Sequence, residues 1–367
     1  MNSNDTSRNR ELDGIRGWAA ISVLLFHFFV ETFGVLFPFV RTGVFRFISD
    51  GYLAVLIFFI LSGDALSSSF FQTKSTASTV RLVLARYFRL VFPIFISCIS
   101  VYILMKLHWT FNKEAAPIVQ REDWLGAFIT FPADFYECIK YSFFEVFFQN
   151  ITEFSYNPFF WTMSIEILGS LIVFINIFIF STIRKPIIVL AAQLLFFIWM
   201  DSWYSLFIVG MLLGYLRSIN VIEKIESKKY LVGIVTVVLI SIVLLNKLYT
   251  IFFITSNFFA YFLKASSIVI IIYCTPMLKL FFKSKVSLFF GEISFPLYAI
   301  HFSVLVSFTS WLILKAQEEG GLYSSKAWWI IFSSILLCIL LAFFFRQIEK
   351  VFLKRMNDYI KKRILKQ

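Results

Sequence analysis

Long stretches of apolar residues recur along the whole 367-residue chain and limit what it can fold into. A helix needs about 20 mostly apolar residues to cross the hydrocarbon core of a bilayer. We expect ten such helices, at 17–38, 51–71, 88–105, 161–183, 187–201, 203–217, 230–249, 251–275, 287–313 and 327–348. The sequence therefore predicts an all-α, polytopic transmembrane bundle. The fifth and sixth stretches are short, and half-spans or a re-entrant pair are the alternative for them.

Composition supports lipid as the solvent for much of the surface. Hydrophobic residues make up 59 % of the chain and charged residues 15 %, whereas soluble domains have about 45–50 % and about 25 %. This excludes an ordinary soluble protein and a disordered chain. The net charge of +12 is explained by Lys and Arg that membrane proteins keep in cytoplasmic loops. The expected partner is therefore the bilayer and not nucleic acid.

Lys and Arg also predict the orientation of the bundle. With the N-terminus inside, 24 of the 34 Lys and Arg residues fall in inside segments, 9 fall outside, and Lys264 falls within a span. This asymmetry predicts that both termini are cytoplasmic. No linker or repeat interrupts the chain, so we expect a single integral-membrane domain over 1–367. Its one long loop, at about 106–160, carries acidic and aromatic residues and is predicted to be extracytoplasmic.

Polar residues at membrane depth are costly and are therefore candidates for function. Arg16 and His27 are eleven residues apart, which on a helix places them on one face, about 16 Å apart along the axis. Arg16 is expected at the cytoplasmic interface and His27 near mid-membrane. The alternatives are a snorkelling interface arginine and a histidine that only packs between helices.

Three further groups of polar residues stand out. Arg86 and Arg89 share a helix face before the third span, where the alternative is ordinary cytoplasmic charge. Glu166 lies about 7 Å into the fourth span from the outside. In the ninth span, Ser294, Tyr298 and His301 surround Pro296, and the alternative is a hydrogen-bonded kink around that proline. For Lys264 we expect a structural pair or a water-filled cavity.

Five short motifs occur in order along the chain. They are ELDGIRGWAAISVLLFH at 11–27, FFILSG at 58–63, RYFR at 86–89, WTMSIE at 161–166 and SFPLYAIH at 294–301. Together, on ten predicted spans, they resemble the motifs of the integral-membrane acyltransferase 3 family over nearly the whole chain. One residue departs from the family pattern, because Asp64 stands where an apolar residue is usual. It could pair with Arg86 or Arg89, or alter the choice of substrate.

The resemblance implies O-acyl transfer, most often of acetyl, from cytoplasmic acyl-CoA to a hydroxyl of a cell-surface carbohydrate. The donor, acyl-CoA and most often acetyl-CoA, is a substrate, so no permanently bound cofactor and no metal are expected. The acceptor is a carbohydrate or a lipid-linked glycan. The implied location is the bacterial cytoplasmic membrane. The resemblance leaves the oligomeric state open.

The chemistry gives each candidate residue a role. His27 is the candidate base for the acceptor hydroxyl, or the residue that carries the acyl group covalently. Arginine suits phosphate, so Arg86 and Arg89 are assigned to the donor, and Arg16 and Glu166 join His27 as catalytic candidates. Acceptor contact or shaping of the site is assigned to the remaining candidates, which are Asp13, Trp161, Ser164, Ser294, Tyr298 and His301.

Two rival functions use similar residues. A glycan exporter or flippase would also line its path with His, Arg and Glu, and a polysaccharide polymerase would need a larger external loop with several arginines. Here the loop is acidic and most arginines are inside, which counts against both rivals.

The predicted topology can be tested by labelling introduced cysteines or by reporter fusions at Asn112 and Asn357. Asn112 is expected outside and Asn357 inside, because the Lys and Arg asymmetry places them on opposite sides. Finding both positions on the same side of the membrane would refute the map.

Overall fold

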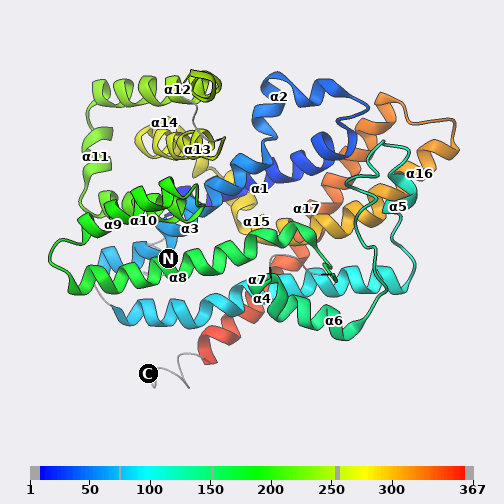
Figure 1. Ribbon diagram of the computed structural model, residues 1–367, viewed down its shortest axis with the longest axis horizontal. Helices are drawn as coiled ribbons and strands as arrows, with labels where there is room; N and C mark the ends of the chain where they lie inside the picture. The colour runs from blue at the N-terminus through cyan, green and yellow to red at the C-terminus, as the bar shows by residue number, and fades with distance from the viewer. Residues whose placement is uncertain (1–8, 74–75, 150–152, 253–256, 360–367) are drawn as a thin grey trace. The chain divides into compact units, whose positions relative to one another are not determined.

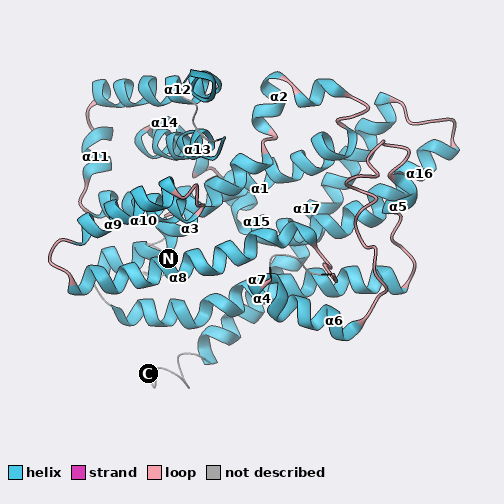
Figure 2. Cartoon of the chain, in the orientation of Figure 1, coloured by secondary structure: helices cyan, strands magenta, loops and turns pink. Residues whose placement is uncertain are grey.

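The computed structural model describes residues 9–73, 76–149, 153–252 and 257–359, the side chains of 76–81, 84 and 245–252 excepted. All regular secondary structure in these residues is helical (Figure 2). The longer helices, traced in Figure 1, are α1 (Arg10–Leu25), α3 (Gly51–Thr73), α4 (Thr76–Lys106), α8 (Thr162–Thr182), α9 (Pro186–Trp199), α10 (Tyr204–Ser218), α12 (Lys229–Phe252), α13 (Asn257–Cys274), α15 (Lys285–Val304) and α17 (Ser324–Tyr359).

Shorter elements connect and extend these helices. The short α-helices are α2 (Gly43–Ile48), α5 (Asn112–Ala115), α6 (Phe135–Lys140), α7 (Val146–Phe148), α11 (Val221–Glu226), α14 (Pro276–Phe282) and α16 (Ser310–Glu318). Three π-helical turns are η1 (Phe26–Phe33), η3 (Tyr141–Glu145) and η5 (Leu305–Thr309). Two 3₁₀ turns are η2 (Pro38–Arg41) and η4 (Pro158–Trp161).

The helices confirm the predicted all-α architecture. Within the described residues, seven helical segments are long and apolar enough to cross a membrane. The remaining three predicted spans coincide with shorter apolar helices at Pro186–Trp199, Tyr204–Ser218 and Lys229–Leu244. Part of the predicted eighth span, at 253–256, lies outside the described residues. The count of ten crossings and the cytoplasmic termini stay predictions.

Two helices extend well beyond the predicted spans. α4 begins at Thr76, twelve residues before the predicted start, and α17 continues to Tyr359, eleven residues after the predicted end. In α17 the ion pair between Arg346 and Glu349, three residues apart and 2.8 Å long, continues the helix past its apolar part. Apolar periodicity locates the lipid-facing part of a helix, and charged turns can prolong it into water.

The chain separates into two compact units. Unit 1 contains Met1–Ala19, Tyr52–Arg86 and Ile165–Gly291, and unit 2 contains Ala20–Gly51, Tyr87–Ser164 and Glu292–Gln367. Each unit is described by itself below. The prediction that 1–367 forms a single domain stays a prediction.

In unit 1, glycines allow α3 and α10 to approach closely. A Cβ at Gly210 would meet the backbone carbonyl of Ile60, and a Cβ at Gly63 would meet that of Phe207. A Cβ at Gly214 would lie 2.9 Å from a carboxylate oxygen of Asp64. Small residues at such contacts are common between membrane helices. The contact leaves room for one buried carboxylate between two apolar helices.

In unit 2, the segment that follows α4 folds back along it. The ring pairs Tyr102–Phe135, Phe95–Phe143 and Tyr87–Phe147 have centroids 5.7, 5.5 and 5.5 Å apart. The three pairs show that α6, η3 and α7 run antiparallel to α4 (Figure 1). The segment 106–160 is therefore more than a loop, because its second half packs along a helix long enough to cross a bilayer.

A buried tyrosine holds the last residues of this segment against the start of α6. The Tyr156 hydroxyl donates to the carbonyl of Asp134 at 2.5 Å and accepts from the Asp134 N–H at 3.0 Å. Burial raises the pKa of Tyr156 to about 12, so the hydroxyl keeps its proton at neutral pH. The start of α6 is thereby tied to the residues just before η4.

Candidate active site

Two histidines lie together in unit 2. His27 belongs to η1 and His301 to α15, and Nδ1 of His27 lies 3.1 Å from Nε2 of His301. His301 is 1 % exposed, whereas His27 is half-buried. The structure brings the histidines of the first and fifth motifs into direct contact. The buried histidine thus supports the more exposed one.

The backbone determines which nitrogen of each ring carries the proton. Nδ1 of His301 lies 2.8 Å from the carbonyl oxygen of Tyr298, which can only accept, so this Nδ1 carries hydrogen and donates. In the neutral ring, Nε2 of His301 then accepts from Nδ1–H of His27. His27 is left with the lone pair on Nε2. That atom is the basic nitrogen of the pair.

Aromatic rings enclose the His27 imidazole. The ring centroids of Phe159, Phe26 and Trp124 lie 3.9, 5.4 and 5.9 Å from that of His27. Phe159 also stacks on His301 at 5.0 Å with an interplanar angle of 18°. An apolar enclosure of this kind limits water and strengthens electrostatic interactions near the reactive nitrogen.

Hydrogen bonds hold the turn that carries Phe159. The Tyr298 hydroxyl donates to the carbonyl of Phe159 and accepts from the hydroxyl of Thr162 at 3.0 Å. The side-chain oxygen of Asn157 accepts from the Phe159 N–H at 3.0 Å, and its amide donates to the Ser97 hydroxyl at 3.0 Å. Among the predicted roles of Tyr298, these bonds favour shaping the site over contact with the acceptor.

An ion pair holds Trp124 near His27. Arg121 contacts the Glu31 carboxylate at 2.9 Å and the Glu31 carbonyl, and its Nε lies 3.1 Å from Asp123. Its guanidinium also lies 5.1 Å from the centre of the Trp124 ring. Because Glu31 lies four residues after His27 in η1, this contact links the segment after α4 to the histidine turn.

Unit 1 holds a second polar cluster. Arg86 forms an ion pair with Glu166, and its Nε donates to the Ser170 hydroxyl at 2.9 Å. The Ser62 hydroxyl donates to the same Glu166 carboxylate at 2.6 Å. The Arg86 and Glu166 side chains are 15 % and 11 % exposed. Two charges with little access to water are therefore stabilised by each other and by two hydroxyls.

This pairing corrects one prediction from the sequence. We expected Arg86 near the inner side and Glu166 near the outer side, at opposite ends of the site. The ion pair shows that they lie together. Arg86 lies at the start of the apolar part of α4, Ala85–Lys106, and its contact with Glu166 depends on how α4 packs against α8, which periodicity along either helix does not reveal.

Arg16 belongs to the same cluster. Its Nη2 donates to the carbonyl of Leu61 at 3.2 Å, and Asp13, Arg86 and Glu166 are among the charged groups that act on it. The residues predicted from the first, third and fourth motifs thus converge in unit 1. Arg16 and His27 belong to different units, and their placement on one helix face stays a prediction.

Asp64 has partners other than the predicted ones. Its carboxylate pairs with Arg217, at the end of α10, and accepts from the Tyr273 hydroxyl of α13 at 2.6 Å. The guanidinium of Arg217 also lies 5.4 Å from the centre of the Tyr273 ring. Asp64 is fully buried, so it needs such partners. The predicted pairing with Arg86 or Arg89 is wrong.

The remaining candidates are less closely grouped. Arg89 is exposed and belongs to unit 2, and Trp161 is 44 % exposed. The Ser164 hydroxyl donates to the Trp161 carbonyl at 3.3 Å, and Ser294 is 8 % exposed. Nζ of Lys264 lies 5.5 Å from the centre of the Tyr261 ring, a cation–π contact that fits the expected structural pair.

Several side chains at these clusters carried no signal in the sequence. Trp124, Phe159 and Arg121 lie in the long predicted loop, where an aromatic or a charge is unremarkable by itself. Phe159 lies two residues before the fourth motif, and that proximity was the available clue. For Arg217 the clue was Asp64, because a buried carboxylate requires a cation or several hydrogen-bond donors.

No group of three or more His, Cys, Asp and Glu side chains is arranged to hold a metal ion within the described part of the chain.

A helical bundle with membrane-spanning segments and two internal polar clusters defines a multi-pass membrane protein with a site for polar chemistry. The model of the acyltransferase 3 family, described as an acyltransferase domain, matches residues 9–347. The chain belongs to this family and is a membrane acyltransferase. No curated protein and no solved structure matches the chain.

The ion pair between Arg86 and Glu166 predicts strongly coupled substitutions. Arg86→Ala or Glu166→Ala alone leaves a poorly solvated charge without its partner, at a cost of about 3–5 kcal/mol. The double substitution removes both charges and should cost clearly less than the sum. Thermal unfolding of the purified protein in detergent measures these effects. A cost of the double substitution that equals the sum of the two single costs to within about 0.5 kcal/mol would contradict the coupling.

The control is the exposed pair of Lys350 and Glu292, 2.9 Å apart with side chains 45 % and 52 % exposed. The same cycle on this pair should give a coupling of about 0–1 kcal/mol, because solvent screens it.

Proposed function

We propose that the protein transfers an acyl group, most simply acetyl, from cytoplasmic acyl-CoA to a hydroxyl of a cell-surface or exported carbohydrate. The observation that carries this proposal is the pair of His27 and His301, which leaves a basic Nε2 on the half-buried ring. A sugar hydroxyl is a weak nucleophile until a base takes its proton. The family supplies the reaction type, and the histidine pair supplies a base for it.

In the proposed reaction, Nε2 of His27 takes the proton of the acceptor hydroxyl as its oxygen attacks the thioester carbonyl. The C–S bond then breaks, and CoA leaves as a thiolate. The acyl carbon remains bound to the sugar oxygen. His27 returns its proton to the thiolate, so that one ester and one free thiol result. During the proton transfer, His301 accepts from Nδ1–H of His27 and favours the cationic ring.

The donor is assigned to the cluster in unit 1. Acyl-CoA carries several phosphate charges, and Arg16 and Arg86 supply guanidinium groups that suit them. A guanidinium has five N–H groups, and Glu166 and Ser170 engage two of those on Arg86. Glu166 thus orients Arg86 without saturating it. We expect a change at Glu166 to alter donor binding through Arg86.

The acceptor and the location follow from the same proposal. A carbohydrate or lipid-linked glycan fits the resemblance of the five motifs to the family, and such acceptors are exposed beyond the bacterial cytoplasmic membrane. The exporter or flippase alternative lacks a comparable observation, because the chain matches an acyltransferase model over 9–347.

Transfer and its dependence on His27 are tested with purified protein in lipid vesicles. Labelled acetyl-CoA and a glycan acceptor should give labelled glycan and one free thiol per transfer. His27→Ala should retain less than about a tenth of the turnover, since a tenfold loss corresponds to about 1.4 kcal/mol in the barrier. His301→Ala should lower kcat by roughly 10- to 100-fold, and His301→Gln less, because its amide oxygen can accept from His27.

Ser334→Ala is the control, because it removes another buried hydroxyl of unit 2, one that is hydrogen-bonded to Thr309 at 2.8 Å and not to either histidine. Without acceptor, an acid quench should leave no label on the protein, since a base forms no acyl-enzyme. Labelled protein would instead favour His27 as a covalent carrier. Full turnover in His27→Ala would remove it from the mechanism.

A further inference from the structure

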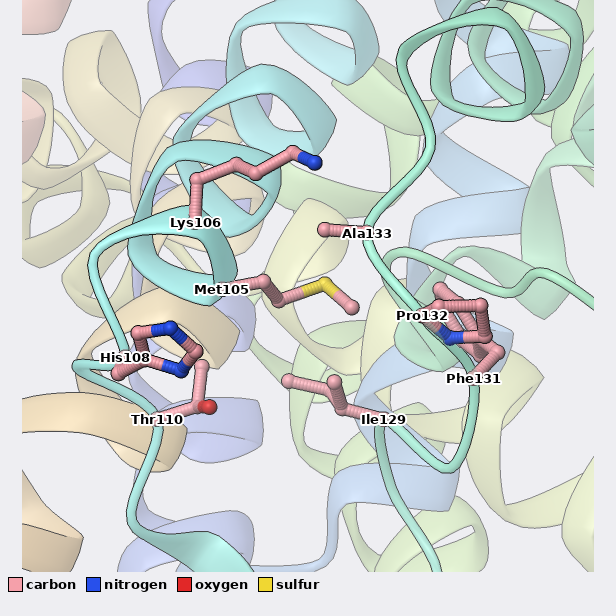
Figure 3. A pocket seen from close by; sticks show the side chains of 8 residues that line it. All are labelled: Met105, Lys106, His108, Thr110, Ile129, Phe131, Pro132 and Ala133. Carbon is pink, nitrogen blue, oxygen red and sulfur yellow. The ribbon is translucent and has the colours of Figure 1, made fainter.

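A half-open cavity of about 430 Å³ lies in unit 2 at the end of α4 (Figure 3). Its polar side is formed by Lys106, His108 and Thr110, and its apolar side includes Met105, Phe131 and Pro132. Figure 3 shows Met105 and Lys106 extending from α4 toward the loop at 129–133. Sites for small molecules occupy about 300–1,000 Å³ and combine apolar walls with a few polar groups. The size and lining of the cavity fit this description.

Two residues that line the cavity have left-handed backbone conformations. His108 has a φ of +56°, and so has Ile129. A β-branched residue with positive φ is an outlier that persists only where its surroundings impose it. The buried amide of Asn112 imposes it here, donating to the carbonyls of Leu125 and Phe128, both at 2.9 Å. The wall containing Ile129 is thus held in a costly shape.

The end of α4 explains the conformation of His108. The His108 N–H donates to the carbonyl of Met105 at 3.1 Å, and the Trp109 N–H donates to that of Leu104 at 2.8 Å. Helix ends of this kind usually place glycine or asparagine at the left-handed position. A histidine at this position costs free energy and places an imidazole at the rim of the cavity.

Residues that are neighbours in the chain belong to the cavity and to the surroundings of the histidine site. The Phe128 ring contacts Phe159 at 5.6 Å and Phe302 at 5.4 Å, and Phe159 packs on His27. The next residue, Ile129, lines the cavity. One short stretch of chain therefore separates the proposed base from the cavity. An extended acceptor at His27 could place a neighbouring unit in the cavity.

The charge of the cavity differs from that of the segment that forms it. No acidic side chain lines it, and Lys106 contributes a positive charge. Between α4 and α6, the surrounding segment carries four acids, Glu114, Glu122, Asp123 and Asp134, against two bases, Lys113 and Arg121. Lys106 therefore attracts a negatively charged group into the cavity, and the carboxylates of the surrounding segment repel such a group.

We propose that this cavity binds a negatively charged sugar unit of the acceptor, next to the unit that receives the acyl group. The inference rests on the proposed function for the acceptor class. The apolar wall packs against the C–H face of the sugar ring, Lys106 binds its acidic group, and His108 and Thr110 bind its hydroxyls.

Binding without acyl-CoA tests this subsite directly. The probes are a tetramer of galacturonic acid and the same tetramer with its carboxyl groups reduced, titrated against the purified full-length protein. The wild type should bind the acidic tetramer more tightly. Lys106→Gln should weaken that binding roughly three- to tenfold and leave the reduced tetramer unaffected. Lys113→Gln removes an exposed charge of the same segment and should change neither.

The His108→Gly variant tests the role of the imidazole without disturbing the fold. Glycine accepts the positive φ, so this variant should fold at least as well as the wild type and bind both tetramers more weakly. Gln120→Gly is the matched control, because Gln120 has a φ of +55° in the same segment and does not line the cavity. It should bind as the wild type does.

Three results would overturn the inference: no binding of either tetramer, equal affinity of the wild type for both, or unchanged binding in Lys106→Gln and His108→Gly. Acyl transfer is read in the separate assay with His27 variants. A chain that transfers acyl groups but fails these titrations would retain the proposed function without this subsite. A chain that binds through Lys106 but transfers nothing would retain the subsite without the function.

Discussion

The shortage of water inside an apolar helical bundle governs where the polar residues of this protein can lie. A charge or hydroxyl at membrane depth must find its partners within the chain, because lipid offers none. The carboxylate of Asp64 is fully buried and is matched by Arg217 and the Tyr273 hydroxyl. Glu166 is matched by Arg86 and Ser62. The close contact of α3 with α10, which glycines permit, makes room for the first of these carboxylates.

In unit 2, the same need for hydrogen-bond partners within the chain determines the protonation of the His27 imidazole. The Tyr298 carbonyl sets the proton on His301, His301 sets the proton on His27, and the basic lone pair of His27 is left on Nε2. The Tyr298 hydroxyl meanwhile holds the turn whose Phe159 ring covers both imidazoles. One residue of α15 thus contributes to the base through its backbone and to the enclosure through its side chain.

Apolar periodicity was enough to predict the helices, since each predicted span coincides at least in part with a helix. It could not predict pairings between distant helices. The partners of Asp64 lie 153 and 209 residues away in sequence, and nothing local marks them. The pairing of Arg86 with Glu166 was missed because it depends on how α4 packs against α8. The motif histidines were identified, but their contact depends on how η1 and α15 pack.

The long segment after α4 shows a different limit. Acidic and aromatic residues predicted an outer cap, yet aromatic contacts lay its second half along α4. Trp124, in its first half, lies beside His27 and is held there by Arg121. Amino-acid composition averages over a segment, whereas these roles depend on single side chains. The segment is therefore part of the proposed active site as well as a connection between helices.

The central claim is that the lone pair of His27 lies on Nε2. The chain has three histidines, so ¹⁵N-histidine labelling of the protein in lipid gives a spectrum that can be assigned with single substitutions. At a pH where the rings are neutral, His27 and His301 should both carry hydrogen on Nδ1, and a coupling across the hydrogen bond should join Nδ1 of His27 to Nε2 of His301. Hydrogen on Nε2 of neutral His27 would contradict the claim, because that nitrogen could not then accept the proton of an acceptor hydroxyl.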